Sequence, residues 1–114
     1  HALQGDGEIL ASVEVPAAIT VTVELIKGRQ EKWPVLETED AWYVLASGED
    51  LNSANPEALD GMAQFLIKRG GGFTKEEWLM LMGVAGNLEI CQIADPWMTA
   101  RFKMPKSLTG DLKF

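Results

Sequence analysis

The sequence predicts an α+β fold rich in β-strand, with a mostly antiparallel or sandwich-like sheet and a helical hairpin inserted between its strands. Three observations support this class. Apolar residues recur at every second position over residues 8–25, at spacings of three and four over 58–85, and again at every second position over 102–104. A period of two is typical of half-buried strands, and a period near 3.6 of amphipathic helices. This order places the helices on one face or end of the sheet.

Two strands are expected at the start of the chain. Over residues 8–15, every odd position from Ile9 to Val15 is apolar. The run over 19–25 alternates more cleanly, is largely β-branched, and ends before Gly28, as strands commonly do. We expect these two strands to pair with each other across residues 16–18. A further antiparallel pair is predicted from residues 35–38 and 42–46.

The period then changes, which predicts two helices. The first is expected to open at Asn55 and Pro56 and to end at the glycines of 70–72. Its apolar face would carry Ala58, Leu59, Met62, Ala63 and Leu66. Residues 74–77 have the T-x-x-E pattern of a capping box and open the second helix, which stops at Gly86. The apolar stripe of this helix comprises Trp78, Leu81, Met82 and Ala85.

Strands return at the end of the chain. Residues 88–94 are predicted to form one strand, and Phe102 and Met104, alternating with Arg101 and Lys103, form a last short one. Asp95 and Pro96 between them are typical of a turn. No repeat or linker divides residues 1–114, so we expect a single domain or the C-terminal piece of a larger one.

Composition narrows the classes of partner. Ten Lys and Arg against seventeen Asp and Glu give a net charge of −7, which disfavours nucleic acids and anionic membrane surfaces. No apolar run approaches the roughly 20 residues that span a bilayer. Cys91 is the one cysteine, so the fold needs no oxidising compartment and a cytoplasmic protein is expected. The start at His1 instead of Met predicts that an upstream portion is missing.

The densest polar cluster is the opening segment HALQGDGE, with His1, Gln4, Asp6 and Glu8. If this segment is extended, Asp6 and Glu8 project from the same face. Two neighbouring carboxylates require either a cation between them or a raised pKa on one of them. A zinc-type ion held by a histidine and a carboxylate can activate water, while a second carboxylate moves protons. Glu24, on a strand's polar face, could complete the site.

Each of these residues also has a plainer interpretation. Acidic, Gly-rich loops before strands are commonly solvated turns, and a Glu such as Glu24 is more often solvent-facing. A processed His1 could bind copper through its amino group and ring. Cys91 is expected to be a buried, inert thiol, because a Cys/His arrangement would have to use His1. Among the aromatic residues, Trp42, Tyr43 and Trp78 are expected in the core, and Trp97 at the surface.

Several blocks of the sequence resemble the acetamidase/formamidase family. They are HALQGDGE, VELIKG, WYVLASGEDLNSA, and NLEICQIADP followed by TARFKMPK, in the family's order and at similar spacing. The resemblance covers nearly all of the chain, whereas the family is substantially longer. It implies a β-rich, sandwich-like fold with added helices. The activity it implies is hydrolysis of short aliphatic amides such as formamide and acetamide to the carboxylate and ammonia.

By this resemblance, the block that begins at His1 belongs to the polar site of the family. It implies a divalent metal at His1 and Asp6, with zinc favoured over calcium, and Asp6 and Glu8 as catalytic residues, Glu8 carrying the proton to the departing ammonia. Gln4 and Glu24 are further candidates. The expected partners are a small amide, the missing N-terminal portion or a partner chain, and further copies in a homo-oligomer. The alternative is a non-catalytic fragment or homologue that binds a cation as a structural or assembly module.

Overall fold

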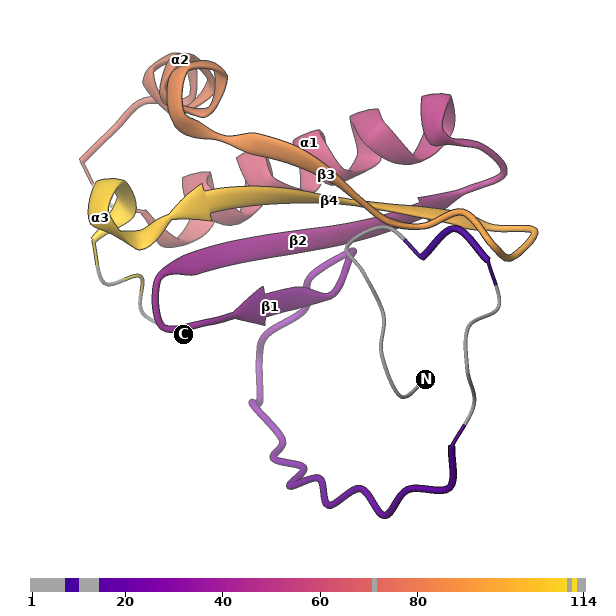
Figure 1. Ribbon diagram of the computed structural model, residues 1–114. Coiled ribbons are helices and arrows are strands. Elements are labelled where there is room, and N and C mark those ends of the chain that lie inside the picture. The colour runs from indigo at the N-terminus through magenta and orange to yellow at the C-terminus, as the bar shows by residue number, and fades with distance from the viewer. Residues whose placement is uncertain (1–7, 11–14, 71, 111, 113–114) are drawn as a thin grey trace.

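The computed structural model describes residues 8–10, 15–70, 72–110 and 112 (Figure 1). Four strands form one antiparallel sheet in the order β1-β2-β4-β3. Their bounds are β1 Val35–Glu37, β2 Ala41–Gly48, β3 Asn87–Gln92 and β4 Met98–Pro105. The pairing of 35–38 with 42–46 and the two late strands are therefore confirmed. Asp95 and Pro96 lie in the connection between β3 and β4 as predicted.

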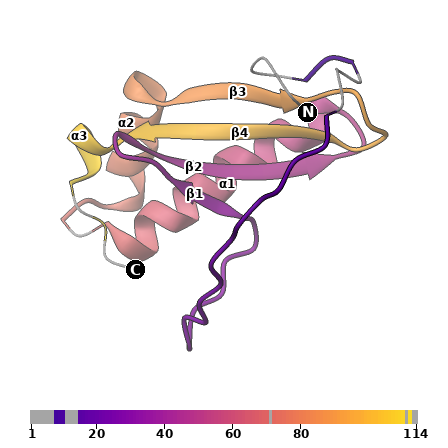
Figure 2. The ribbon, with the colours of Figure 1, turned by 60° about the horizontal axis from the view of Figure 1, so that its bottom comes forward.

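Two long helices lie between β2 and β3 in the sequence and cover one face of the sheet (Figures 1 and 2). They are α1 Leu51–Arg69 and α2 Lys75–Ala85, and a short α3, Lys106–Thr109, follows β4. The α+β class with a helical hairpin inserted between strands is confirmed. In the described part of the chain, no helix combines the length and apolar character needed to cross a membrane.

The hydrophobic core lies between the sheet and these helices. In β2 the buried side chains alternate with partly exposed ones, because successive side chains of a strand point to opposite faces. The rings of Trp42 and Phe65 are 5.4 Å apart, centroid to centroid. The largest fully buried side chains are Trp42, Trp78, Phe65, Met62, Leu66, Met82, Met104 and Val44. Trp42 and Trp78 are core residues as predicted, whereas Tyr43 faces the other side of the sheet and is half-buried.

The first helix begins earlier than predicted. Asp50 is its N-cap, and the backbone N–H of Ser53 donates to the Asp50 carboxylate at 2.8 Å. This local cap decides the helix start, so Pro56 lies inside α1 and the predicted opening at Asn55 and Pro56 is wrong. Leu59, predicted on the apolar face, is 43% exposed. The predicted end is confirmed, with Gly70 as the C-cap.

The second helix follows its prediction closely. Thr74 and Glu77 form the capping box, in which each side chain accepts a hydrogen bond from the backbone N–H of the other residue. Gly86 is the C-cap. An added Cβ at Gly86 would lie 2.3 Å from the ring of Phe102 and 2.6 Å from the carbonyl oxygen of Met82. Glycine is therefore required where the chain leaves α2 and passes into β3.

The predicted hairpin at the start of the chain is not present. Residues 15–26 have no strand, and their apolar side chains are exposed; residues 11–14 of the first predicted strand lie outside the described residues. Glu8 pairs with Gln92 in a parallel bridge instead. The segment loops away from the sheet in Figure 1. Alternation shows which side chains a strand would bury, but a strand also needs a partner for its backbone N–H and C=O groups.

Candidate functional site

Within the opening segment HALQGDGE, the structure describes Glu8, and this residue is fixed to the end of β3. Its backbone N–H donates to the carbonyl oxygen of Cys91 at 2.9 Å, and its own carbonyl accepts from the N–H of Ile93 at 2.8 Å. Its side chain is partly exposed. Two backbone hydrogen bonds thus hold Glu8 beside the turn that joins β3 to β4.

Gln92 shapes this turn from within. Its side-chain amide nitrogen donates to the carbonyl oxygen of Trp97, and its side-chain oxygen accepts from the backbone N–H of Asp95 at 3.0 Å. The pairing register shifts between Ile90 and Gln92, as at a β-bulge, a feature that re-aims side chains near functional sites. The side-chain hydrogen bonds of Gln92 therefore hold the turn beside which Glu8 binds.

The turn is connected to β2 through a pair of hydroxyl groups. Ser47 and Thr99 share a hydrogen bond of 2.9 Å across the sheet, and Thr99 also lies 3.5 Å from the Gln92 amide nitrogen. Ser47 and Trp97 line an open hollow of about 410 Å³. Its walls are Lys32, Trp33, Ser47, Gly48, Glu49, Asp50, Ser53, Glu57 and Trp97. A hollow of this volume is large enough for a small molecule.

Two carboxylates that line this hollow already accept hydrogen bonds from neighbouring residues. Asp50 accepts hydrogen bonds from the backbone N–H and the side chain of Ser53, which lower its pKa. Glu57 accepts from Lys32 and from the indole N–H of Trp33, and these bonds lower its pKa as well. A general base works best with a pKa near the working pH. Asp50 and Glu57 are therefore poor proton carriers at neutral pH.

Glu24, the predicted additional residue, lies elsewhere. Its side chain is exposed and lines a separate hollow of about 350 Å³ together with Arg69 from the last turn of α1. Glu8 lies beside Gln92, at the end of the sheet where β2 ends and α1 begins. The 19 residues of α1 span about 28 Å at 1.5 Å per residue. The structure does not bring Glu24 and Glu8 together.

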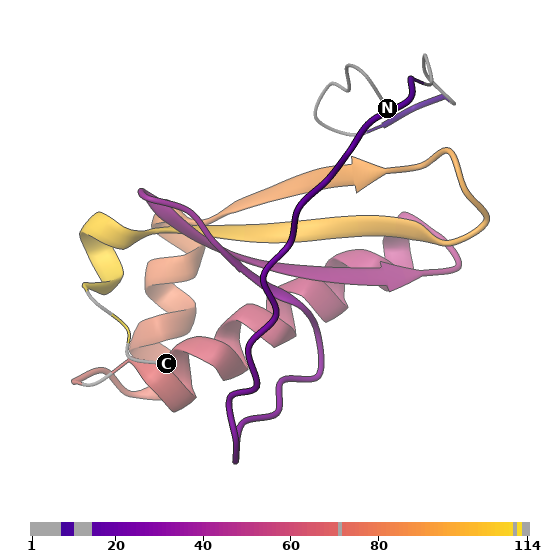
Figure 3. The ribbon, with the colours of Figure 1, turned by 90° about the horizontal axis from the view of Figure 1, so that it is seen from below.

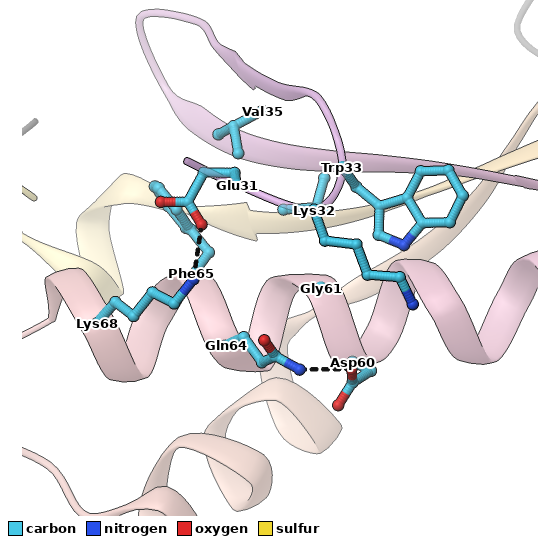
Figure 4. Close-up of a pocket in the computed structure, with 10 residues that line it drawn as sticks. Glu31, Lys32, Trp33, Val35, Asp60, Gly61, Gln64, Phe65 and Lys68 are labelled. Carbon is cyan, nitrogen blue, oxygen red and sulfur yellow. Dashed lines mark hydrogen bonds and ion pairs between the residues drawn. The ribbon is translucent and has the colours of Figure 1, made fainter. Parts of the chain in front are cut away.

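Figure 4 shows a third cavity, between residues 31–35 and α1. Its volume is about 10 Å³, enough for one water molecule. Glu31 beside it bonds to Lys68 at 3.2 Å and to Arg69 at 2.8 Å. Burial raises the pKa of Glu31 and is the largest single influence, but the hydrogen bonds from Arg69 and Lys68 together outweigh it and the pKa is lowered. This cavity therefore belongs to the packing of residues 31–35 against α1.

His1, Gln4 and Asp6 lie outside the described residues. Within the residues that the structure does describe, no three His, Cys, Asp or Glu side chains gather as metal ligands would. Cys91 is half-buried, and its backbone carbonyl anchors Glu8. Periodicity did not identify Gln92, Ser47 or Thr99, because their roles depend on the pairing of strands far apart in the sequence.

Comparison with solved structures identifies the fold. An acetamidase from Bacillus halodurans aligns over 75% of this chain and 30% of its own, with 35% identity and a TM-score of 0.66. A protein described as a predicted acetamidase/formamidase from Thermoanaerobacter tengcongensis aligns over 78% of this chain and 30% of its own, with 34% identity and a TM-score of 0.69. No protein-family model and no curated protein matches the sequence.

An acetamidase from Yersinia enterocolitica aligns over 75% of this chain and 26% of its own, with a TM-score of 0.71. Its identity of 24% speaks for the fold alone. The chain therefore has an acetamidase/formamidase-like fold, which confirms the resemblance found in the sequence. It spans about 30% of the length of the first two structures that it matches.

Proposed function

We propose that this chain supplies part of the active site of an amidase that hydrolyses short aliphatic amides such as formamide and acetamide. The observation that carries the proposal is the acetamidase/formamidase-like fold at 34–35% identity. The chain corresponds to under a third of those proteins, so the complete site needs polypeptide beyond it. The assembled protein is proposed to be a homo-oligomer.

Glu8 is the proposed proton carrier. Its backbone N–H and carbonyl bond to Cys91 and Ile93 at the end of β3, which fixes the point from which its carboxylate extends. A carboxylate at hydrogen-bond distance from both the attacking water and the amide nitrogen can take a proton from the first and give it to the second. The amide nitrogen then leaves as ammonia.

His1 and Asp6 are the proposed ligands of a divalent metal, with zinc favoured. An imidazole and a carboxylate suit zinc, and such an ion makes water nucleophilic near neutral pH. Asp6 and Glu8 lie two residues apart in the sequence. Asp6 would hold the ion, and Glu8 would carry the proton. Donor chemistry supports His1 and Asp6 as ligands, since imidazole nitrogen and carboxylate oxygen both bind zinc.

The test is ammonia release from formamide and acetamide. The chain would be assayed alone and together with the part of the Bacillus halodurans acetamidase that lies outside the match, with metal content measured in both samples. We expect metal and turnover only in the combined sample. Metal binding without ammonia release would favour the cation-binding assembly module over the amidase. No metal and no turnover in either sample would overturn the proposal.

Within an active assembly, Glu8→Gln tests the proton carrier. We expect a loss of about 10²-fold or more in kcat, the usual contribution of a positioned acid or base. Glu39→Gln is the matched control, because it removes an exposed carboxylate in the turn between β1 and β2, at the opposite end of the sheet, and should leave kcat unchanged. Unchanged turnover in Glu8→Gln would remove Glu8 from the mechanism.

A further inference from the structure

The segment formed by residues 15–26 has the sequence of a strand and the exposure of a loop. Ile19, Val21, Val23 and Leu25 alternate with Thr20, Thr22 and Glu24. The four apolar side chains are 75–87% exposed. Single exposed apolar residues are normal, but a contiguous apolar stripe of this kind marks an interaction surface. The stripe is therefore a candidate for contact with another polypeptide.

Among the described residues, neither edge strand of the sheet pairs with the segment. One edge strand, β1, has three residues, which is too short to pair with seven. The other edge strand, β3, is engaged by Glu8 at its end. The face of the sheet opposite the helices carries Arg101, which bonds to Glu89 at 2.5 Å and lies over the ring of Tyr43. Figure 3 shows the segment crossing that side, and Figure 1 shows it standing away from the sheet.

We infer that residues 19–25 form a β-strand whose partner is a strand from the part of an acetamidase-like subunit that lies outside this chain. The matched structures contain about 70% of their length beyond the match (100 − 30). Residues 19–23 are all β-branched, which favours a strand over a helix. The odd-numbered side chains pack into an apolar layer, and the backbone adds to a sheet by β-augmentation.

This assignment rests on the fold and not on amide hydrolysis, so association is measured without substrate. The full chain would be mixed with the part of the Bacillus halodurans acetamidase that lies outside the match, and the complex followed by sedimentation velocity and hydrogen exchange. We expect the amides of 19–25 to exchange rapidly in the chain alone and at least tenfold more slowly in the complex. Rapid exchange in both samples would overturn the inference.

The two faces of the strand supply matched variants. Val21→Lys with Val23→Lys places charges on the apolar face and should weaken the complex at least tenfold. Thr20→Lys with Thr22→Lys places the same charges on the other face and should leave it intact. Circular dichroism should show both variants folded, because the segment lies outside the core. Equal effects of the two pairs would refute a one-sided strand. Protection that appears in the chain alone as its concentration rises would assign the partner to a second copy, contrary to the inference.

Discussion

Strand β2 and residues 19–25 carry the same period-two alternation, yet one is at the centre of the core and the other is exposed. In β2, Trp42, Val44 and Ala46 are each 1% exposed. In the segment, Val21 and Val23 are 75% and 87% exposed. The difference lies in their neighbours. β2 pairs with β1 on one side and β4 on the other, and α1 packs on its face.

This difference shows that an apolar pattern specifies a face and not the layer that covers it. Hydrophobic stabilisation scales with the apolar area removed from water, and the segment removes little. Substitutions in the two regions should therefore have different effects on the stability of the chain alone. The following experiments examine that contrast, beginning with the largest expected effect.

The same substitution in the two regions is the most direct comparison. Val44→Ala removes two carbon atoms from the core and should lower the free energy of unfolding by about 2–3 kcal/mol, from ~0.8 kcal/mol per carbon plus a cavity contribution. Val23→Ala should change it by less than about 0.5 kcal/mol. Urea denaturation of the chain alone measures both. A loss at Val23 as large as that at Val44 would show that the segment is packed in the isolated chain.

A pair of glycines tests packing inside the helix–sheet body. Gly86→Ala should destabilise the chain by about 1–2 kcal/mol, because the new Cβ would overlap the Phe102 ring and the Met82 carbonyl. Gly83→Ala, in the last turn of α2, meets nothing within 4 Å and should stabilise by about 0.5–1 kcal/mol. Thermal unfolding would show opposite shifts in Tm. Shifts of the same sign would contradict the close contact at Gly86.

The smallest expected effect concerns pH and the cap of α1. Hydrogen bonds from Ser53 lower the pKa of Asp50 in the folded chain, so the unfolded chain binds the proton more readily. This contribution is complete above the ordinary Asp value of 3.8 and is lost as pH falls through the lowered pKa. Asp50→Asn keeps a capping side chain, so its urea midpoint should match wild type at pH 7 and fall less steeply below pH 4. An identical acid profile would remove Asp50 from the pH dependence.

The sequence predicted the local features of the body well. The capping box of α2, its end at Gly86, and the strand pairs on both sides of the helical hairpin all depend on residues close together in the chain. The start of α1 was missed because Pro56 was taken as its opening, whereas the carboxylate of Asp50 satisfies the first backbone N–H groups. The prediction of a hairpin before residue 27 was wrong because alternation alone does not supply a partner strand.

For the candidate site, the sequence identified Glu8 as a candidate proton carrier but did not show which residues surround it. Its proposed roles, and those of His1, Gln4, Asp6 and Glu24, remain predictions. Glu8 binds to residues 91–93, more than eighty positions away (91 − 8 = 83). Gln92, Ser47 and Thr99, which join that turn to a nearby hollow, became evident only when β2, β3 and β4 were placed side by side.

The sequence by itself thus determined the helix caps, the turns and the face that each strand would bury, because these follow from hydrogen bonds and side-chain directions within a few residues. Only the tertiary structure decided which strands find partners, where Glu8 is anchored, and that residues 19–25 stay uncovered. Those outcomes depend on contacts between distant parts of the chain, and for the uncovered strand on polypeptide that we place outside it.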